Sequence, residues 1–173
     1  MTPPAESPNP NNVSPETAAA ERPSVGFFTR AFASGLFSGY SPVASGTVGS
    51  AVGLAIYFIP GFEQLYVILP FSVLVYFLGV RTAEAMEKVY GQDPSEVTID
   101  EVLGMWVSLL FLPKKILIAV IAFFVFRILD IVKPYPARRF DNTPGGSGVM
   151  LDDVISGIYT NLLIQLAVVL KII

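Results

Sequence analysis

The sequence predicts an all-α, membrane-associated bundle of about three to five hydrophobic helices. Hydrophobic residues make up 53% of the 173 residues and charged residues only 14%, whereas soluble domains carry about 25% charged residues. The apolar residues also fall into long runs, with little of the strict alternation that marks strands. Such runs are typical of helices that face lipid or a dry protein interior.

Two regions differ in composition. Residues 1–24 are rich in Pro, Asn, Ser and Ala and contain no apolar run, so we expect a disordered N-terminal tail. Residues 25–173 then form one domain. It opens with a short amphipathic piece from Phe27 to Phe37, which suits the membrane interface.

The first two apolar segments are separated by Pro60-Gly61. The first runs from about Val43 to Ile59 and starts with the small, polar sequence SGTVGS. The second runs from Leu65 to Val80 and is followed by a polar helical stretch. Within that stretch Glu84 and Lys88 have the i,i+4 spacing of an ion pair on a solvated helix face.

The later apolar segments differ in length. The run from Val102 to Leu112 has 11 residues, whereas about 20 are needed to span a bilayer. We therefore expect it to be re-entrant or packed within the protein. The run from Ile116 to Val132 is long enough to cross, and Pro134 and Pro136 should end it. The last segment runs from Val149 to Ile173, and we expect the acidic pair within it to lie in the first turn of its helix.

Composition excludes several kinds of chemistry. The net charge is −3 and no basic stripe is present, so no nucleic-acid partner is expected. Histidine and cysteine are both absent, which rules out a histidine or thiolate nucleophile or metal ligand. No GKS or GKT sequence occurs, so a nucleotide cofactor bound by a P-loop is not indicated. Any metal site must use oxygen ligands, and Mg²⁺ is the ion that such a site favours.

Five acidic residues flank or interrupt the apolar segments, and such residues are functional candidates by default. They are Asp100, Glu101, Asp130, Asp152 and Asp153. Helix capping explains Asp100 or Asp152 alone equally well, and an ion pair with Arg127 is the alternative for Asp130. The adjacent pair Asp152 and Asp153 would repel unless a cation lies between them. We predict a Mg²⁺ site with ligands drawn from Glu101, Asp130, Asp152 and Asp153.

Two glycine-containing segments could approach a phosphate group. SGTVGS supplies backbone N–H groups and the hydroxyls of Ser45, Thr47 and Ser50, and GGSG over residues 145–148 is expected to precede the last helix. The alternative for SGTVGS is small-residue packing between membrane helices. Positive charge for a phosphate would come from Arg127, Lys133 and Arg138. Arg138 is equally explained as a membrane-surface anchor.

Three stretches of the chain resemble the phosphatidylglycerophosphatase A family. They are SGLFSGYSPVASGTVGS, DPSEVTIDEVLGMW and FRILDIVKPYPARRFDNTPGGSGVMLDDVISG. Together they cover nearly everything from residue 33 to 160, in the family's order. Ser45 departs from the family pattern, which has proline at this position.

The resemblance implies a Mg²⁺-dependent phosphatase that hydrolyses phosphatidylglycerophosphate to phosphatidylglycerol and inorganic phosphate. It implies a multi-pass protein of the bacterial inner membrane whose active site faces the cytoplasm, in agreement with the positive-inside rule. Asp100, Asp130 and Asp153 are expected to take part in catalysis, with Asp100 orienting the attacking water.

Two other classes of protein were weighed. A CDP-alcohol phosphotransferase would carry several aspartates on one helix after an Asp-Gly, and that signature is absent. A small transporter or scaffold would distribute its charges through several spans, whereas here they gather at segment ends.

Overall fold

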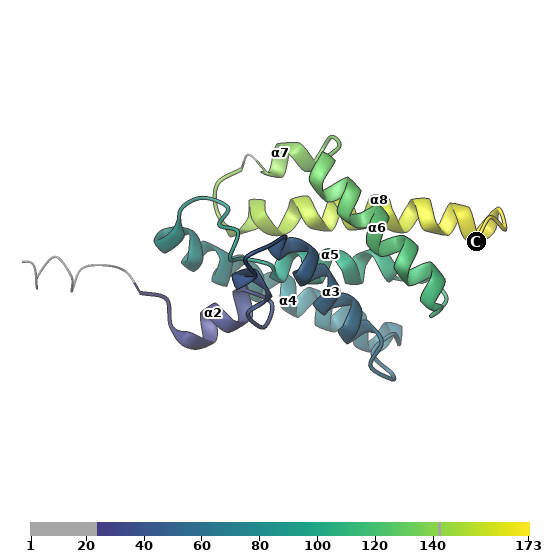
Figure 1. Cartoon of the computed structure of the whole chain (residues 1–173), viewed down its shortest axis with the longest axis horizontal. Helices are drawn as coiled ribbons and strands as arrows, with labels where there is room; N and C mark the ends of the chain where they lie inside the picture. The colour runs from purple at the N-terminus through teal and green to yellow at the C-terminus, as the bar shows by residue number, and fades with distance from the viewer. Residues whose placement is uncertain (1–23, 142) are drawn as a thin grey trace, which may run out of the picture.

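The computed structural model describes residues 24–141 and 143–173, and this part of the chain is all helical, as predicted (Figure 1). The predicted disordered tail, residues 1–24, lies almost wholly outside the described residues. The elements in chain order are α2 (Phe27–Ala33), η2 (Ser38–Tyr40), α3 (Ser45–Tyr57), α4 (Leu65–Tyr90), α5 (Ile99–Leu109), α6 (Ile116–Val132), α7 (Ala137–Asp141) and α8 (Gly146–Val169).

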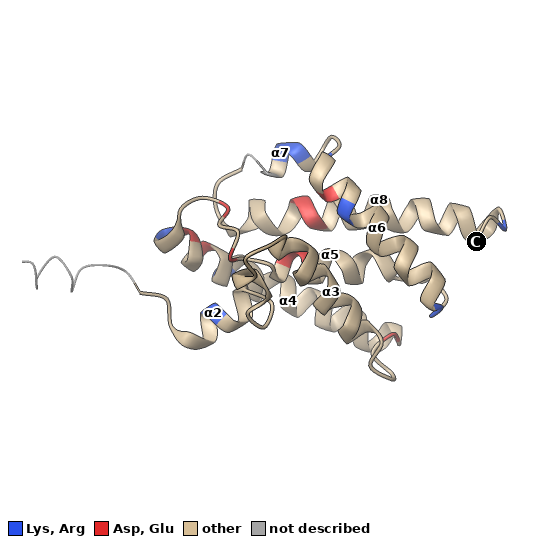
Figure 2. Cartoon of the chain, in the orientation of Figure 1, with Lys and Arg blue, Asp and Glu red and all other residues tan. Residues whose placement is uncertain are grey.

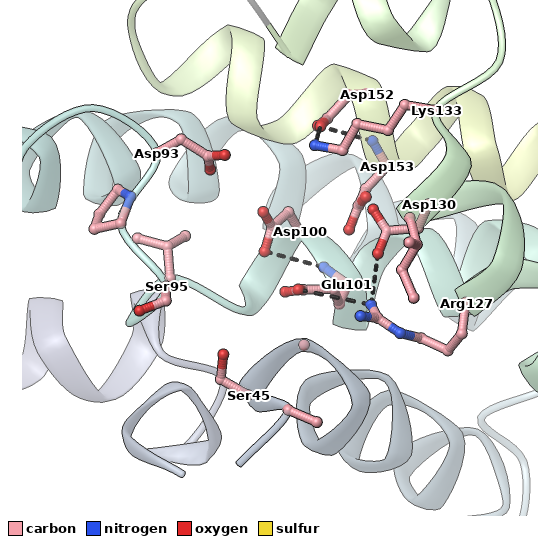
Figure 3. Close-up of a pocket in the computed structure, with 15 residues that line it drawn as sticks. Ser45, Asp93, Ser95, Asp100, Glu101, Arg127, Asp130, Lys133, Asp152 and Asp153 are labelled. Atoms are coloured by element: carbon pink, nitrogen blue, oxygen red, sulfur yellow. Dashed lines mark hydrogen bonds and ion pairs between the residues drawn. The ribbon is translucent and has the colours of Figure 1, made fainter. Parts of the chain in front are cut away.

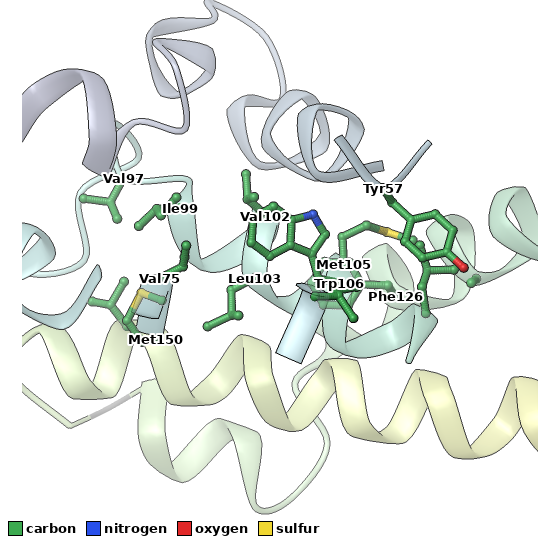
Figure 4. Close-up of a cluster of buried hydrophobic side chains, with 14 of the residues drawn as sticks. Tyr57, Val75, Val97, Ile99, Val102, Leu103, Met105, Trp106, Phe126 and Met150 are labelled. Atoms are coloured by element: carbon green, nitrogen blue, oxygen red, sulfur yellow. The ribbon is translucent and has the colours of Figure 1, made fainter. Parts of the chain in front are cut away.

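The short helix α5 is the centre of the bundle and contacts α3, α4, α6 and α8. Its apolar side chains Leu103, Met105 and Trp106 are almost fully buried, together with Phe126 from α6 and Met150 from α8 (Figure 4). Of the two expectations for this 11-residue helix, packing within the protein is therefore the one that the structure adopts.

The C-terminal end of α5 has hydrogen-bond donors within the protein. A helix leaves its last four carbonyl groups without intrahelical partners, and a buried carbonyl without a partner is costly. Asn161 of α8 supplies the missing donors: its Nδ2 donates to the carbonyls of Ser108 at 3.1 Å and Leu110 at 2.6 Å. Gln165 Nε2 in turn donates to Asn161 Oδ1 at 2.6 Å. These bonds allow a helix that is too short to span a bilayer to end inside the bundle.

Helix α3 lies unusually close to α5 because its facing residues are glycines. A Cβ on Gly49 would lie 2.8 Å from Thr98 Cβ, and one on Gly53 would lie 2.9 Å from the carbonyl oxygen of Val102. Trp106 Nε1 also donates to the carbonyl of Gly53 at 2.9 Å. The segment SGTVGS is thus the start of a helix that packs through its small residues.

The segment GGSG was expected to precede the last helix, and this is wrong. Helix α8 begins at Gly146, so the acidic pair lies in its second turn, not its first. The cause is packing: a Cβ on Gly146 would collide with the carbonyl oxygen of Val80. Glycine therefore lets α8 start early, pressed against α4.

Within residues 24–141 and 143–173, two helices are long and apolar enough to cross a membrane, α4 with 26 residues and α8 with 24. Helix α4 joins the predicted apolar run and the polar stretch after it into one helix, and the predicted pair of Glu84 and Lys88 forms at 3.4 Å. Helix α6 ends at Val132, before the prolines, as predicted.

The bundle has two distinct ends. At one end Lys114, before α6, forms an ion pair with Glu63 at 2.7 Å and joins the α5–α6 turn to the α3–α4 turn. Helix α6 then runs 17 residues to Lys133 at the other end, a length of about 26 Å at 1.5 Å per residue. We call the end that holds Lys133 the site end.

Candidate active site

A pocket of about 380 Å³ opens at the site end, where α3, α5, α6 and α8 meet. Acidic positions of α5, α6 and α8 lie near one another at this end of the bundle (Figure 2). The pocket is lined by Ala44, Ser45, Gly46, Asp93, Pro94, Ser95, Val97, Asp100, Glu101, Arg127, Asp130, Ile131, Lys133, Asp152 and Asp153. Figure 3 shows the charged members pointing toward one another.

Three carboxylates form the centre of the pocket. One oxygen from each of Asp100, Glu101 and Asp153 lies within 4.8 Å of the other two. Asp100 and Glu101 stand in the first turn of α5, where the helix dipole favours negative charge, and Asp153 comes from α8. We call these residues the carboxylate trio.

Two oxygen atoms of the carboxylate trio lack hydrogen-bond partners among the described residues. They are Glu101 Oε2 and Asp153 Oδ2, and both are buried. Burial raises the pKa of Asp100 to about 6. Burial and the neighbouring Asp100 carboxylate also hold the pKa of Glu101 well above its usual range. Protons or a cation must therefore balance these groups.

The residues present fit a hard divalent cation. All three side chains offer carboxylate oxygens, two of those oxygens lack other partners, and Mg²⁺ binds through a few carboxylates together with waters and substrate phosphate. The chain contains no His or Cys that would favour a softer metal.

Arg127 lies beside the trio and is bound to carboxylates. Its Nη1 is 2.7 Å from Asp130 Oδ2 and 3.7 Å from Glu101 Oε1. The same nitrogen lies 3.4 Å from Ser50 Oγ on α3. The ion pair that the sequence offered as the alternative for Asp130 is thus present, and it lies in the pocket wall rather than on a lipid-facing surface.

Lys133 supplies the second positive charge. It caps α6 in the left-handed conformation, with φ of 47°, an uncommon conformation for a residue with a side chain. From there its Nζ reaches Asp152 Oδ2 at 2.7 Å. Asp130 and Asp152 are therefore each in a close ion pair at 2.7 Å, whereas the contact of Arg127 with Glu101 of the trio is longer, at 3.7 Å.

The structure brings seven predicted site residues into this one pocket. They are Asp100, Glu101, Arg127, Asp130, Lys133, Asp152 and Asp153. The predicted phosphate ligands Thr47, Ser50 and Arg138 do not line it. Ser50 is fully buried behind Arg127 and donates to the carbonyl of Gly46, Thr47 is half-buried on α3, and Arg138 is exposed on α7. Their roles stay predictions, as does the division of the carboxylates into metal ligands and base.

Two polar pocket residues, Asp93 and Ser95, were not singled out from the sequence; they lie in the α4–α5 connection, at the rim of the pocket (Figure 3). Ser45, whose hydroxyl the sequence offered as a phosphate donor, begins α3 and also lines the pocket. Asp93 and Ser95 belong to the stretch DPSEVTIDEVLGMW, so their closeness in sequence to Asp100 was the available signal.

An acidic pocket with two cationic side chains, set at one end of an apolar helical bundle, defines a membrane enzyme of phosphate-ester chemistry that works without histidine or cysteine. A profile of the phosphatidylglycerophosphatase A family matches residues 31–168. The chain belongs to this family and is a phosphatase.

Curated relatives support the assignment. A Bacteroides thetaiotaomicron protein named “Putative phosphatidylinositol-3-phosphatase” is 40% identical over 155 residues, covering 85% of this chain and 96% of the relative. Phosphatidylglycerophosphatase A of Escherichia coli is 38% identical over 129 residues, covering 72% and 74% of the two chains. The enzyme of that name from Haemophilus influenzae is 32% identical, covering 72% and 79%. No solved protein structure matches the chain at a significant level.

Proposed function

We propose that this protein is a Mg²⁺-dependent phosphatase that hydrolyses phosphatidylglycerophosphate to phosphatidylglycerol and inorganic phosphate. The observation that carries the Mg²⁺ dependence is the carboxylate trio, in which two buried oxygens lack partners. The choice of substrate rests on the family and on the names of its E. coli and H. influenzae members.

In this proposal Asp100, Glu101 and Asp153 hold the cation. When bound, Mg²⁺ supplies Lewis-acid stabilisation of the charge that builds on the phosphoryl oxygens. Lys133, held by Asp152 at 2.7 Å, adds a fixed positive charge at the same pocket. Arg127 holds Asp130 at 2.7 Å, and Asp130 lies across from Asp153 in the pocket (Figure 3). Because Asp100 holds the cation in this proposal, Asp130 takes the place of Asp100 as the candidate base for the attacking water.

The proposed setting is the inner membrane of a bacterium, with several crossings and the pocket facing the cytoplasm. Two apolar helices long enough to cross indicate a membrane protein. Arg81 lies in the stretch of α4 that contacts α8 at the site end and Lys88 lies beyond that contact, whereas Lys133, Arg138 and Arg139 follow α6 at that end. A basic excess of this kind favours the cytoplasmic side.

Phosphatidylinositol 3-phosphate is the second candidate substrate. The relative whose name contains this activity is matched along 96% of its length. Both lipids carry a phosphate monoester, so the trio and Lys133 would serve either. The rim residues Ser45, Asp93 and Ser95 would then face the alcohol part of the headgroup.

The test is phosphate release by the purified, detergent-solubilised protein from each lipid, with Mg²⁺, with EDTA, and with Mg²⁺ restored. We expect release from phosphatidylglycerophosphate that stops in EDTA and returns with Mg²⁺. Glu101→Gln should abolish it, whereas Glu63→Gln, which removes a carboxylate at the opposite end of the bundle, should not. Release that EDTA leaves unchanged would refute the Mg²⁺ dependence. Release from phosphatidylinositol 3-phosphate alone would refute the substrate.

A further inference from the structure

Helix α6 exposes one continuous apolar face along its whole length. Five exposed residues, Ile116, Val120, Phe124, Ile128 and Ile131, are spaced three or four apart, so they share one side of the helix. Leu117 and Val132 are exposed next to this side, at the two ends of the helix. The opposite side, with Ala122, Phe126 and Asp130, is buried against the bundle.

This face leads directly into the pocket. Ile131 is 71% exposed and also lines the pocket. Among the pocket-lining residues, Ile131 and Ala44 are the two that are both apolar and exposed. The opening of the pocket is therefore bordered by apolar residues from the end of α6 and the start of α3, Ile131 and Ala44. We call this apolar border the lip.

Helix α3 continues the lip in the same direction. From Ala44 its exposed residues Val48, Ala51 and Ala55 follow at helical spacing. Helices α3 and α6 contact each other, and Gly46 and Ser50 of α3 meet Arg127 between them. We call the exposed faces of the two helices, residues 44–55 and 116–131, the acyl track.

We propose that the acyl chains of the phospholipid substrate lie along the acyl track, and that the lipid enters the pocket sideways from the membrane between Ala44 and Ile131. The inference rests on the proposed function, because it takes the substrate to be a lipid phosphate monoester. Such a molecule joins a charged phosphate to apolar chains. The pocket presents charged groups and the adjoining acyl track presents apolar side chains, which is the order in which the phosphate and the acyl chains follow one another along the lipid.

The other lipid-facing helices do not offer this continuity. Helix α4 contributes no residue to the pocket lining, and α8 contributes Asp152 and Asp153, both buried. The exposed apolar residues of α8 beyond Asp153 begin at Ile158, five residues on, about 8 Å along the helix, and none of them lines the pocket. By contrast Ile128 is one turn from the pocket.

Photo-crosslinking in a bilayer tests this placement. The probe is a phosphatidylglycerophosphate analogue with a non-hydrolysable phosphonate headgroup and a diazirine in one acyl chain. The reference probe is phosphatidylcholine with the same chain, which reports ordinary lipid contact. We expect excess labelling by the phosphonate probe on the acyl track, removed by unlabelled phosphatidylglycerophosphate. Equal labelling by both probes is expected at exposed residues of α8 and α4.

A matched pair of variants gives an independent measure. Ile131→Trp narrows the lip, and we expect kcat/KM for dioleoyl phosphatidylglycerophosphate to fall roughly tenfold. Leu162→Trp places the same side chain on an exposed site of α8, 58% exposed, and should leave kcat/KM unchanged. Equal kinetics for both variants, or excess labelling centred on α4 or α8, would overturn the acyl track while leaving the proposed function intact. A wild-type protein that releases no phosphate from the lipid would instead refute the proposed function.

Discussion

Replacing Gly46 by alanine tests whether the packing of α3 sets the geometry of the trio. A Cβ at this position would collide with Glu101 Oε1 and would lie 2.7 Å from Arg127 Nη2 and 3.0 Å from Nη1. Alanine is favoured over glycine inside a helix by about 1 kcal/mol, which offsets much of an overpacking cost of about 1–3 kcal/mol. The protein should therefore stay folded while Glu101 and Arg127 are displaced. Because a misplacement of about 1 Å at a reacting centre can cost about 10²-fold, we expect kcat/KM to fall by about 10²-fold.

The assay is phosphate release from phosphatidylglycerophosphate in saturating Mg²⁺, with the Tm measured on the same preparations. Gly26→Ala is the control, since a Cβ there meets nothing within 4 Å, and it should match wild type. Gly49→Ala separates the causes: its Cβ would lie 2.8 Å from Thr98 Cβ, away from the carboxylates. We expect Gly49→Ala to retain more activity than Gly46→Ala at an equal loss of Tm. Gly46→Ala with activity within twofold of wild type would refute the reasoning.

Two further predictions concern the trio and the end of α5. Asp153→Asn should abolish turnover while the protein still inserts in the membrane. We also expect Mg²⁺ to raise the Tm of wild type, and Asp153→Asn should remove most of that rise. Full activity of the variant in saturating Mg²⁺ would take Asp153 out of the site. Asn161→Leu should lower stability by about 2–4 kcal/mol, because the carbonyls of Ser108 and Leu110 lose their donor inside the bundle; thermal unfolding in detergent measures this, and a Tm equal to that of wild type would contradict it.

The sequence was sufficient to place the charged residues in one site because of how membrane segments alternate. Asp100 stands before one apolar run, Asp130 at the end of the next and Asp152 near the start of the last. Successive helices that run in opposite directions return such positions to the same end of a bundle. The structure confirms that these residues share one pocket. The same logic gave the all-α bundle, since apolar runs leave the backbone few other ways to satisfy its polar groups.

The pairing within the site could not be read from the sequence. Which carboxylate meets which cation depends on how each helix is rotated about its axis and on single backbone conformations. Lys133 reaches Asp152 from a left-handed residue at the end of α6, and no pattern of residue types predicts that conformation for lysine. Likewise, the carboxylate of Asp100 lies beside those of Glu101 and Asp153, whereas the carboxylate of Asp130 forms an ion pair with Arg127.

The spacing of the glycines in and after SGTVGS predicts the packing of this segment better than its composition does. Gly46, Gly49 and Gly53 are spaced three and four apart, so they form one face of a helix, and that face packs on α5 and Arg127. Ser50 belongs to the same buried region and accepts from Arg127 instead of facing the pocket. Spacing therefore favours the packing interpretation, whereas small, polar composition favoured a phosphate loop.

The charges of the pocket connect metal binding to substrate binding. Six carboxylates line it, those of Asp93, Asp100, Glu101, Asp130, Asp152 and Asp153, against the two cationic side chains Arg127 and Lys133. The close ion pairs use both cations, on Asp130 and Asp152, so the pocket keeps an excess of negative charge that includes the whole trio. A phosphate monoester carries negative charge of its own, so it would be repelled from the trio unless a divalent cation or protons came first. If the proposed Mg²⁺ dependence holds, Mg²⁺ would be needed for the lipid phosphate to enter the pocket as well as for the chemistry, and we expect EDTA to weaken the binding of the phosphonate probe as strongly as it stops turnover.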